Sequence, residues 1–249
     1  MTLAHDVAGD GPALVLLHSA VCDRRMWDPQ WSALVDAGHR VVRCDLRGFG
    51  ESPMADRPYN NADDVADLLG SLGIERAALV GSSFGGAVAL ELAARRPEMI
   101  TRMVLLCAAS PDHVPGEELR AFGRQENALL AAGDLDGAVE LNVRTFLGPE
   151  AGEEVRERVR RMQRHAFEVQ LAAEEDFEVE VEVDLALITA PCLAVSGGHD
   201  LQDFRDIAAR LAGRLADARH EELPWAGHLP GLERPDAVTG LLRRFLAAT

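Results

Sequence analysis

The segment GSSFG at residues 81–85 constrains the fold more than any other part of this 249-residue chain. It follows a short apolar run, Ala77–Val80, and leads into a stretch with helical spacing, Phe84–Arg96. A Gly-x-Ser-x-Gly segment between a strand and a helix holds its central serine at a sharp, strained turn, with the helix N-terminus directed at that serine. The pattern therefore predicts that Ser83 is a nucleophile, whereas Ser82 occupies only a variable position of the motif.

Short apolar runs alternate with longer segments of helical spacing along most of the chain. The runs expected to be buried strands are Ala13–His18, Val41–Asp45, Ala77–Val80, Met103–Cys107, Cys192–Ser196 and one near His220–Leu223. Helical spacing covers Trp27–Ala37, Ala62–Leu72, Phe84–Arg96, Asp203–Ala212 and Asp236–Leu246. Such alternation predicts an open, mostly parallel α/β sheet with helices on both faces. Since one more strand fits before Ala13, we expect about seven strands.

Residues 112–184 interrupt this alternation and have a composition of their own, with 19 acidic residues against 8 arginines. Their spacing predicts the amphipathic helices Glu117–Ala132, Leu135–Phe146 and Gly152–Glu174, followed by an extended acidic connector or edge strand, Phe177–Asp184. We therefore predict a helical cap over 112–184, inserted into a core formed by 1–111 and 185–249.

Composition excludes several classes of function. All 25 basic residues are arginines, so the chain has no lysine for a Schiff base, pyridoxal phosphate or a Walker-type phosphate loop. A formal net charge of −16 argues against binding to nucleic acid or to an anionic membrane surface. The four cysteines are far apart and lack CxxC spacing, which indicates buried reduced thiols; no metal and no cofactor are expected. With neither a signal peptide nor a membrane span in the sequence, we expect a soluble, cytoplasmic protein.

A serine nucleophile needs a base to remove its proton and an acid to orient that base. Asp200 follows the predicted strand Cys192–Ser196, and His228 follows the last predicted strand. Loops at the carboxyl ends of parallel strands converge on one crevice, so Ser83, Asp200 and His228 can meet there as a triad in the chain order Ser, Asp, His.

Other residues compete for these roles. Asp112, after the strand Met103–Cys107, is a second candidate for the acid. His199 lies beside Asp200 but is expected to face away as a loop residue. Structural or solvent-exposed positions are expected for the remaining candidates: His18, His113, His165, His220 and Cys22.

Taken together, these motifs resemble the α/β-hydrolase superfamily over essentially the whole chain. The residues that carry the resemblance are 16–18 (LLH), 45–52 (DLRGFGES), 81–86, 198–200 (GHD), 227–230 (GHLP) and 233–235 (ERP). Residues 17–28 and the cap arrangement are most similar to small bacterial esterases and 3-oxoadipate enol-lactonase-like hydrolases. The resemblance implies the α/β-hydrolase fold and an oxyanion hole made by the backbone N–H groups of Ala20 and Phe84. Ser19 stands where the family usually has glycine, and a positive φ there would strain the loop.

A pocket between core and cap is expected to bind a small-molecule substrate. Its candidate contacts are Ala20, Val21, Trp27, Phe84, Phe122, Phe146, Trp225 and Leu229, and Arg144 could meet a substrate carboxylate, as an enol-lactonase would require. The leading hypothesis is a serine hydrolase of carboxylic esters or lactones. Carbon–carbon bond hydrolysis, a cofactor-free perhydrolase or haloperoxidase activity, and a small-ligand binding protein on the same fold are the alternatives. The sequence leaves the oligomeric state open.

Overall fold

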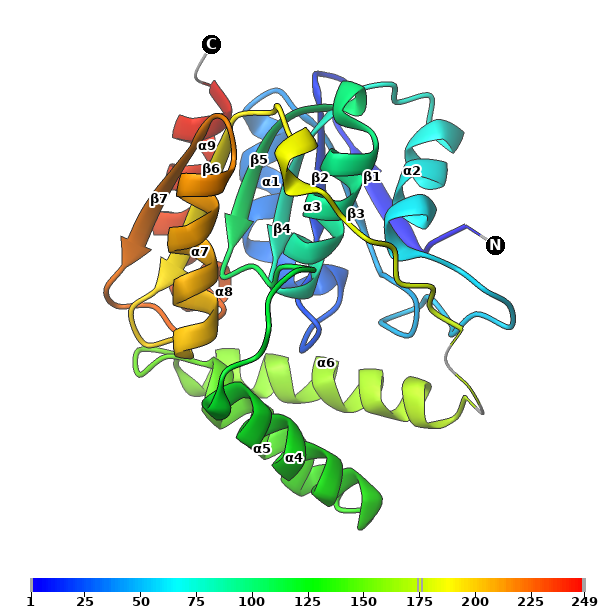
Figure 1. The fold of residues 1–249 in the computed structure, drawn as a ribbon, viewed down its shortest axis with the longest axis vertical. Helices are drawn as coiled ribbons and strands as arrows, with labels where there is room; N and C mark the ends of the chain where they lie inside the picture. Colours follow the sequence, from blue (N-terminus) through cyan, green and yellow to red (C-terminus); the bar gives the residue numbers. More distant parts are fainter. Residues whose placement is uncertain (1, 174, 176, 248–249) are drawn as a thin grey trace.

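A computed structural model describes residues 2–173, 175 and 177–247 of the chain. Within these residues, seven strands form one sheet in the order β1-β3-β2-β4-β5-β6-β7 (Figure 1). The strands are β1 (His5–Ala8), β2 (Ala13–Leu17), β3 (Arg40–Cys44), β4 (Ala77–Ser82), β5 (Ile100–Leu106), β6 (Cys192–Gly197) and β7 (Ala218–Leu223). All neighbours pair in parallel except β1 and β3. The predicted mostly parallel sheet of about seven strands is confirmed.

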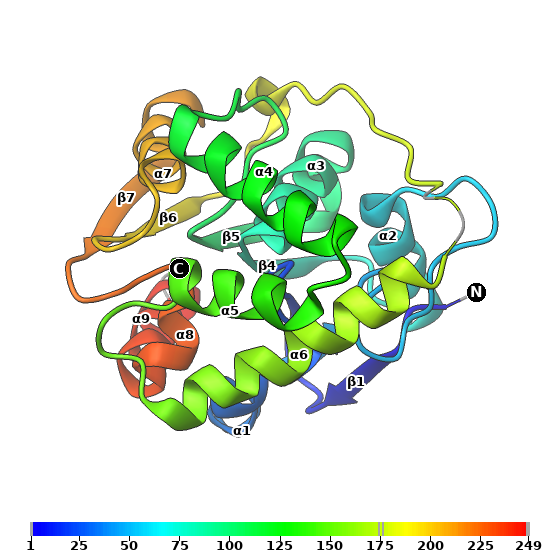
Figure 2. The same ribbon diagram turned by 90° about the horizontal axis from the view of Figure 1, so that it is seen from below.

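Helices cover both faces of this sheet, which is why its central strands are apolar over nearly their whole length. One face carries α1 (Asp28–Asp36), α8 (Pro230–Glu233) and α9 (Pro235–Ala247); the other carries α2 (Asn61–Ser71), α3 (Phe84–Arg95) and α7 (Gln202–Arg214) (Figures 1 and 2). The five predicted core helices match α1, α2, α3, α7 and α9 to within two residues. All four cysteines are free and buried, as expected.

Three helices from the interrupting segment lie beyond the carboxyl ends of the strands. They are α4 (Glu117–Ala131), α5 (Leu135–Phe146) and α6 (Glu153–Leu171), and they cross in front of the sheet in Figure 2. The predicted end of the last of them, Glu174, lies outside the described residues. The acidic connector joins no strand of the sheet among the described residues, although Tyr59 and Glu178 form an isolated bridge. The division of the chain into core and cap stays a prediction.

None of the described helices is both long enough and apolar enough to cross a lipid bilayer. The longest of them, α6, has 19 residues and carries charged side chains along its length.

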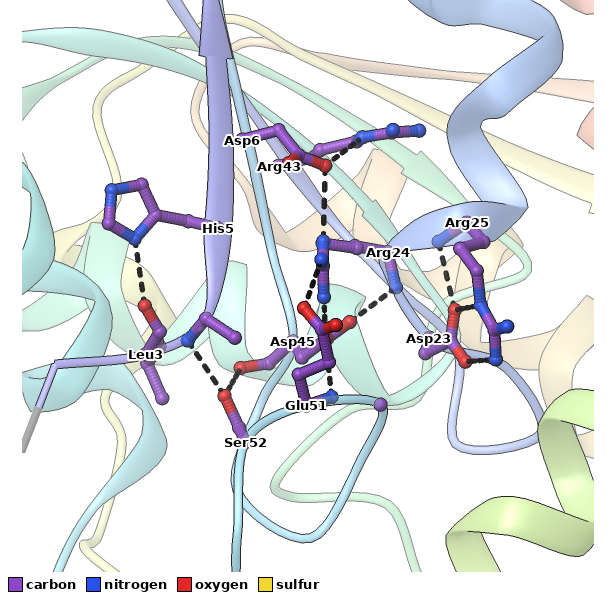
Figure 3. A network of polar contacts seen from close by, with 12 residues as sticks. Leu3, His5, Asp6, Asp23, Arg24, Arg25, Arg43, Asp45, Glu51 and Ser52 are labelled. Carbon is purple, nitrogen blue, oxygen red and sulfur yellow. Dashed lines mark hydrogen bonds and ion pairs between the residues drawn. The ribbon is translucent and has the colours of Figure 1, made fainter.

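The loop after β3 is held by a buried carboxylate (Figure 3). Asp45 is inaccessible to solvent and accepts hydrogen bonds from the backbone N–H groups of Arg24, at 2.7 Å, and Glu51, at 2.8 Å. The guanidinium of Arg24 forms an ion pair with Asp45 and extends to Asp6, 3.1 Å away. Ser52 donates to the carbonyl oxygen of Asp45 at 2.8 Å. These contacts join β1, β3 and the segment that follows β2, so they brace two of the loops at the carboxyl end of the sheet.

Replacing Asp45 with asparagine is expected to lower the free energy of unfolding by about 2–3 kcal/mol, because the amide cannot accept hydrogen bonds on both sides as the carboxylate does, so a buried N–H donor is left unpaired. Arg24 keeps Asp6 and Glu51 as partners of its charge. Denaturant-induced unfolding measures the change. Asp63→Asn is the matched control, since Asp63 pairs with Arg95 at a partly exposed site and its loss is expected to cost at most about 1 kcal/mol. Equal costs for the two variants would contradict this role of Asp45.

Candidate active site

Ser83 lies at the sharp turn between β4 and α3. Its φ is 51°, and only one other non-glycine residue in the described chain has a positive φ. The turn is fixed by packing on both sides: a Cβ atom on Gly81 would lie 2.4 Å from the carbonyl oxygen of Gly85, and one on Gly85 would lie 2.4 Å from that of Leu17. The two glycines of the motif are therefore steric requirements, and the neighbouring strands hold the strained backbone of Ser83 in place.

His228 and Asp200 form a buried pair. Nδ1 of His228 lies 2.7 Å from Oδ2 of Asp200, and the two side chains are 1% and 0% exposed. The other carboxylate oxygen of Asp200 accepts the N–H of Leu201 at 2.8 Å. Because Asp200 follows β6 and His228 follows β7, the pair forms where two adjacent parallel strands end. Nε2 is the ring nitrogen left to exchange a proton with another group.

Two phenylalanine rings hold the imidazole of His228. The ring centroids of Phe146 and Phe204 lie 4.8 Å and 4.1 Å from that of His228. The backbone N–H of His228 also donates to the carbonyl oxygen of Phe146 at 2.8 Å, which ties the histidine loop to α5. The loop before His228 is also held by Glu233, whose half-buried carboxylate accepts the N–H of Gly227 at 2.9 Å. Burial raises the pKa of Glu233, and hydrogen bonds from this loop oppose the rise.

A cavity of about 310 Å³ brings Ser83 and His228 to one surface. Its lining comes from the loops at the carboxyl ends of the strands and from α3 to α7: Ser19, Ala20, Val21, Phe49, Ser83, Phe84, Ala109, Phe122, Glu126, Asn142, Phe146, Gln163, Phe167, Gln170, Phe204 and His228. No hydrogen bond joins Ser83 to His228 among the described residues, and contacts of this kind commonly tighten only when substrate binds.

Five of the predicted substrate contacts line this cavity: Ala20, Val21, Phe84, Phe122 and Phe146. The structure places the other four elsewhere. Trp27 and Leu229 are fully buried in the core, Trp225 lies under the guanidinium of Arg234, and Arg144 is exposed on α5. Arg144 therefore offers no cation to the cavity.

Two backbone N–H groups near Ser83, those of Ala20 and Phe84, are the predicted oxyanion donors. Outside helices and strands, the described residues include no backbone hydrogen bond donated by Ala20 or Phe84. Ser19 has no positive φ, so the loop takes a shape that serine adopts without strain. It is fixed by a hydrogen bond from Cys22 to the carbonyl oxygen of Ser19 at 2.9 Å.

The competing residues have other partners. Asp112 accepts the hydroxyl of Ser110 at 2.6 Å and pairs with Arg214. His199 is exposed. Nε2 of His18 accepts the N–H of Leu46 at 2.9 Å, and burial lowers the pKa of His18, which keeps this ring neutral as an internal brace.

Cys107, Asp200 and His228 place three potential metal-ligand atoms within 4.8 Å of one another. A closed zinc site needs four ligands, and a cysteine binds zinc as its thiolate, whereas the described residues supply three groups here. Burial, followed by the nearby carboxylate of Asp200, raises the pKa of the Cys107 thiol well above its ordinary value. The group fits an acid–base pair with a neutral thiol beside it better than it fits a metal centre.

Sequence reasoning missed nine residues of the cavity: Ser19, Phe49, Ala109, Glu126, Asn142, Gln163, Phe167, Gln170 and Phe204. A signal for three of them was present. Glu126, Asn142 and Gln163 each lie four positions from a phenylalanine of the same helix, and residues four apart share one helix face.

Comparison with known proteins gives the family of the chain. A model of the alpha/beta hydrolase family matches residues 14–241. The chain belongs to this family. A Variovorax paradoxus protein named as a carbamate hydrolase, RutD, is 33% identical, with 99% of this chain and 97% of that protein covered. The pimeloyl-(acyl-carrier protein) methyl ester esterase of Aeromonas hydrophila is 28% identical over 99% of this chain and 100% of its own length.

Solved structures give the same result. The enol-lactonase from Burkholderia xenovorans LB400 superposes with a TM-score of 0.81 at 28% identity, covering 99% of this chain and 96% of that chain. Together these similarities identify the present protein as an alpha/beta hydrolase family member with hydrolases among its relatives.

Proposed function

We propose that this alpha/beta hydrolase cleaves carboxylic ester or lactone bonds of a small molecule through Ser83, His228 and Asp200. The observation that carries the proposal is the buried His228–Asp200 pair in the wall of the cavity that also contains Ser83 at its strained turn. A base oriented by a carboxylate and a serine on one concave surface are the groups that acyl transfer needs.

The reaction proceeds in two halves. Ser83 Oγ attacks the substrate carbonyl carbon while Nε2 of His228 takes its proton, and the imidazolium returns that proton to the leaving alkoxide. Water then attacks the acyl-enzyme with His228 again as base, which releases the acid and restores Ser83. The free backbone N–H groups of Ala20 and Phe84 stabilise the oxyanion, each contributing a factor of about 10²–10³ in rate.

The test combines turnover with covalent labelling. Acid release is followed at constant pH for short to long acyl esters and for five- and six-membered lactones. A fluorophosphonate should phosphonylate Ser83 with loss of fluoride, and because the chain is cut by trypsin only at arginine, the label should appear in the peptide Ala77–Arg95. Tandem mass spectrometry separates Ser83 from Ser82. Labelling elsewhere, or release without labelling, would contradict the proposal.

A carbamate is the second candidate substrate, favoured by the 33% identity to the Variovorax protein over nearly the full length of both chains. The same acyl transfer applies, with an amine or ammonia leaving in place of an alcohol. Adding alkyl carbamates to the panel separates carbamate hydrolysis from ester hydrolysis, since a carbamate hydrolase should turn over the carbamates at least as fast as the matching esters.

A further inference from the structure

The wall of the active-site cavity formed by α4, α5 and α6 contains buried or half-buried polar side chains; besides Gln170 of α6, which donates to the carbonyl oxygen of Gly48 at 3.2 Å, there are three. These are Glu126 from α4, Asn142 from α5 and Gln163 from α6, which we call the polar triplet. Much of the remaining lining is aromatic, including Phe122, Phe146 and Phe167 from the same three helices. Polar groups in such a wall cost free energy unless they are paired, so their presence in one cavity requires an explanation.

Two members of the polar triplet present oxygen atoms as acceptors. Gln163 is only 3% exposed, and its Oε1 has no hydrogen-bond partner among the described residues. Asn142, 2% exposed, donates both amide hydrogens, one to Glu126 at 2.5 Å and one to the carbonyl oxygen of Ala138 at 3.0 Å. Only the oxygen of Asn142 is therefore left for a ligand.

Glu126 gives this acceptor surface its charge. Most glutamates of the neighbouring helices form ion pairs with arginine, but no ion pair to Glu126 is found among the described residues. Burial raises the pKa of Glu126, and the hydrogen bond from Asn142 opposes that rise. The adjoining hollow contains Arg47, but its guanidinium is paired with Asp64 at 2.8 Å.

No arginine occurs among the described residues that line the cavity, and the chain has no lysine. A substrate carboxylate would therefore meet the carboxylate of Glu126, with no arginine or lysine in the described lining to neutralise it. An N–H or O–H group would meet two amide oxygens and a carboxylate, which are the acceptors it needs.

We propose that the polar triplet is a specificity subsite that binds an N–H or O–H donor, neutral or cationic, on the non-reacting part of the substrate and excludes a carboxylate there. The inference rests on the proposed hydrolysis at Ser83 and narrows it to a substrate class. Dicarboxylic monoesters and their lactones are poor substrates by this reasoning, whereas hydroxy- and amino-substituted esters are good ones.

Four methyl esters of equal chain length test the subsite: those of hexanoic, 6-hydroxyhexanoic and 6-aminohexanoic acid, and the monomethyl ester of adipic acid. Acetate esters of hexanol and of its hydroxy, amino and carboxy analogues repeat the series with the substituent on the alcohol. In at least one series, the hydroxy or amino ester should exceed the unsubstituted ester about tenfold in kcat/KM. The carboxylate ester should fall below the unsubstituted one by about 100-fold.

Glu126→Gln keeps the shape of the side chain and removes its charge, so the ratio of amino to carboxy ester should fall at least about tenfold. Gln163→Leu should reduce the advantage of the hydroxy ester over the unsubstituted one. Glu118→Gln is the matched control, because Glu118 is exposed on the same helix and does not line the cavity; the ratios should stay at their wild-type values. A carboxylate ester hydrolysed as well as the unsubstituted ester, or ratios equally changed by Glu118→Gln, would overturn the proposal.

Binding of the same compounds to Ser83→Ala, measured by calorimetry, gives the ranking without turnover. Loss of hydrolysis in Ser83→Ala with the predicted ranking supports both the triad and the subsite. The predicted ranking in binding, with no hydrolysis by the wild type, would keep the subsite and overturn the hydrolase proposal. Hydrolysis by the wild type, with all four compounds bound and hydrolysed equally well, would keep the hydrolase proposal and overturn the subsite.

Discussion

Replacing Ser83 with alanine is expected to lower kcat for the preferred ester by about 10⁶-fold, because the acyl-enzyme route is lost with the nucleophile. What activity is left comes from binding and from the oxyanion donors, which act on water attack as well. KM should change little, since the small hydroxyl contributes little to ground-state binding. Initial rates with the best ester of the panel measure both constants, and fluorophosphonate labelling of residues 77–95 should disappear with the activity.

Ser82→Ala is the matched control, one residue away in the same segment. Ser82 is 1% exposed, and its hydroxyl has no partner among the described residues. Removing an unpaired buried hydroxyl costs no hydrogen bond, so activity should stay within about threefold of the wild type and stability should not fall. If Ser83→Ala kept the wild-type rate, or if Ser82→Ala lost it instead, the assignment of the nucleophile would be wrong.

The fold could be predicted well because local signals and global topology agree. The strand Ala77–Val80, the two glycines and the helix after Ser83 each favour the same sharp turn, and close packing against Leu17 requires it. Likewise, Asp200 and His228 lie in the loops that follow two adjacent strands, so their 2.7 Å contact follows from topology once the sheet is known.

The substrate cavity was predicted less completely, for a physical reason. Trp27 and Trp225 were proposed as contacts from residue type and position in the chain, but an aromatic side chain packs equally well into a core or under an arginine. Which face of α4, α5 and α6 points at Ser83 depends on how these helices cross the sheet. Short-range periodicity puts Glu126 and Gln163 on the same helix faces as Phe122 and Phe167 but does not specify that these faces point at the cavity, which the structure shows.

Asp200→Asn is expected to lower kcat by about 10⁴-fold while leaving KM close to the wild-type value. In the wild type, the buried carboxylate accepts a hydrogen bond from the N–H at Nδ1 of His228, which leaves Nε2 as the basic nitrogen. The amide of asparagine would donate to Nδ1 instead, if its oxygen keeps the N–H of Leu201. The imidazole would then carry its proton on Nε2 and could not remove the proton of Ser83.

Asp206→Asn is the control for this change, since Asp206 is an exposed carboxylate on α7, six residues from Asp200. It should leave kcat within about twofold, because an exposed charge is screened by solvent. A loss of less than tenfold in Asp200→Asn would mean that another acid orients His228. Asp112→Asn would then be the decisive variant, although the contacts of Asp112 with Ser110 and Arg214 direct its carboxylate elsewhere. Asp200 is buried, and its carboxylate has one backbone N–H and the imidazole of His228 as its partners. Its negative charge therefore acts mainly on the catalytic histidine.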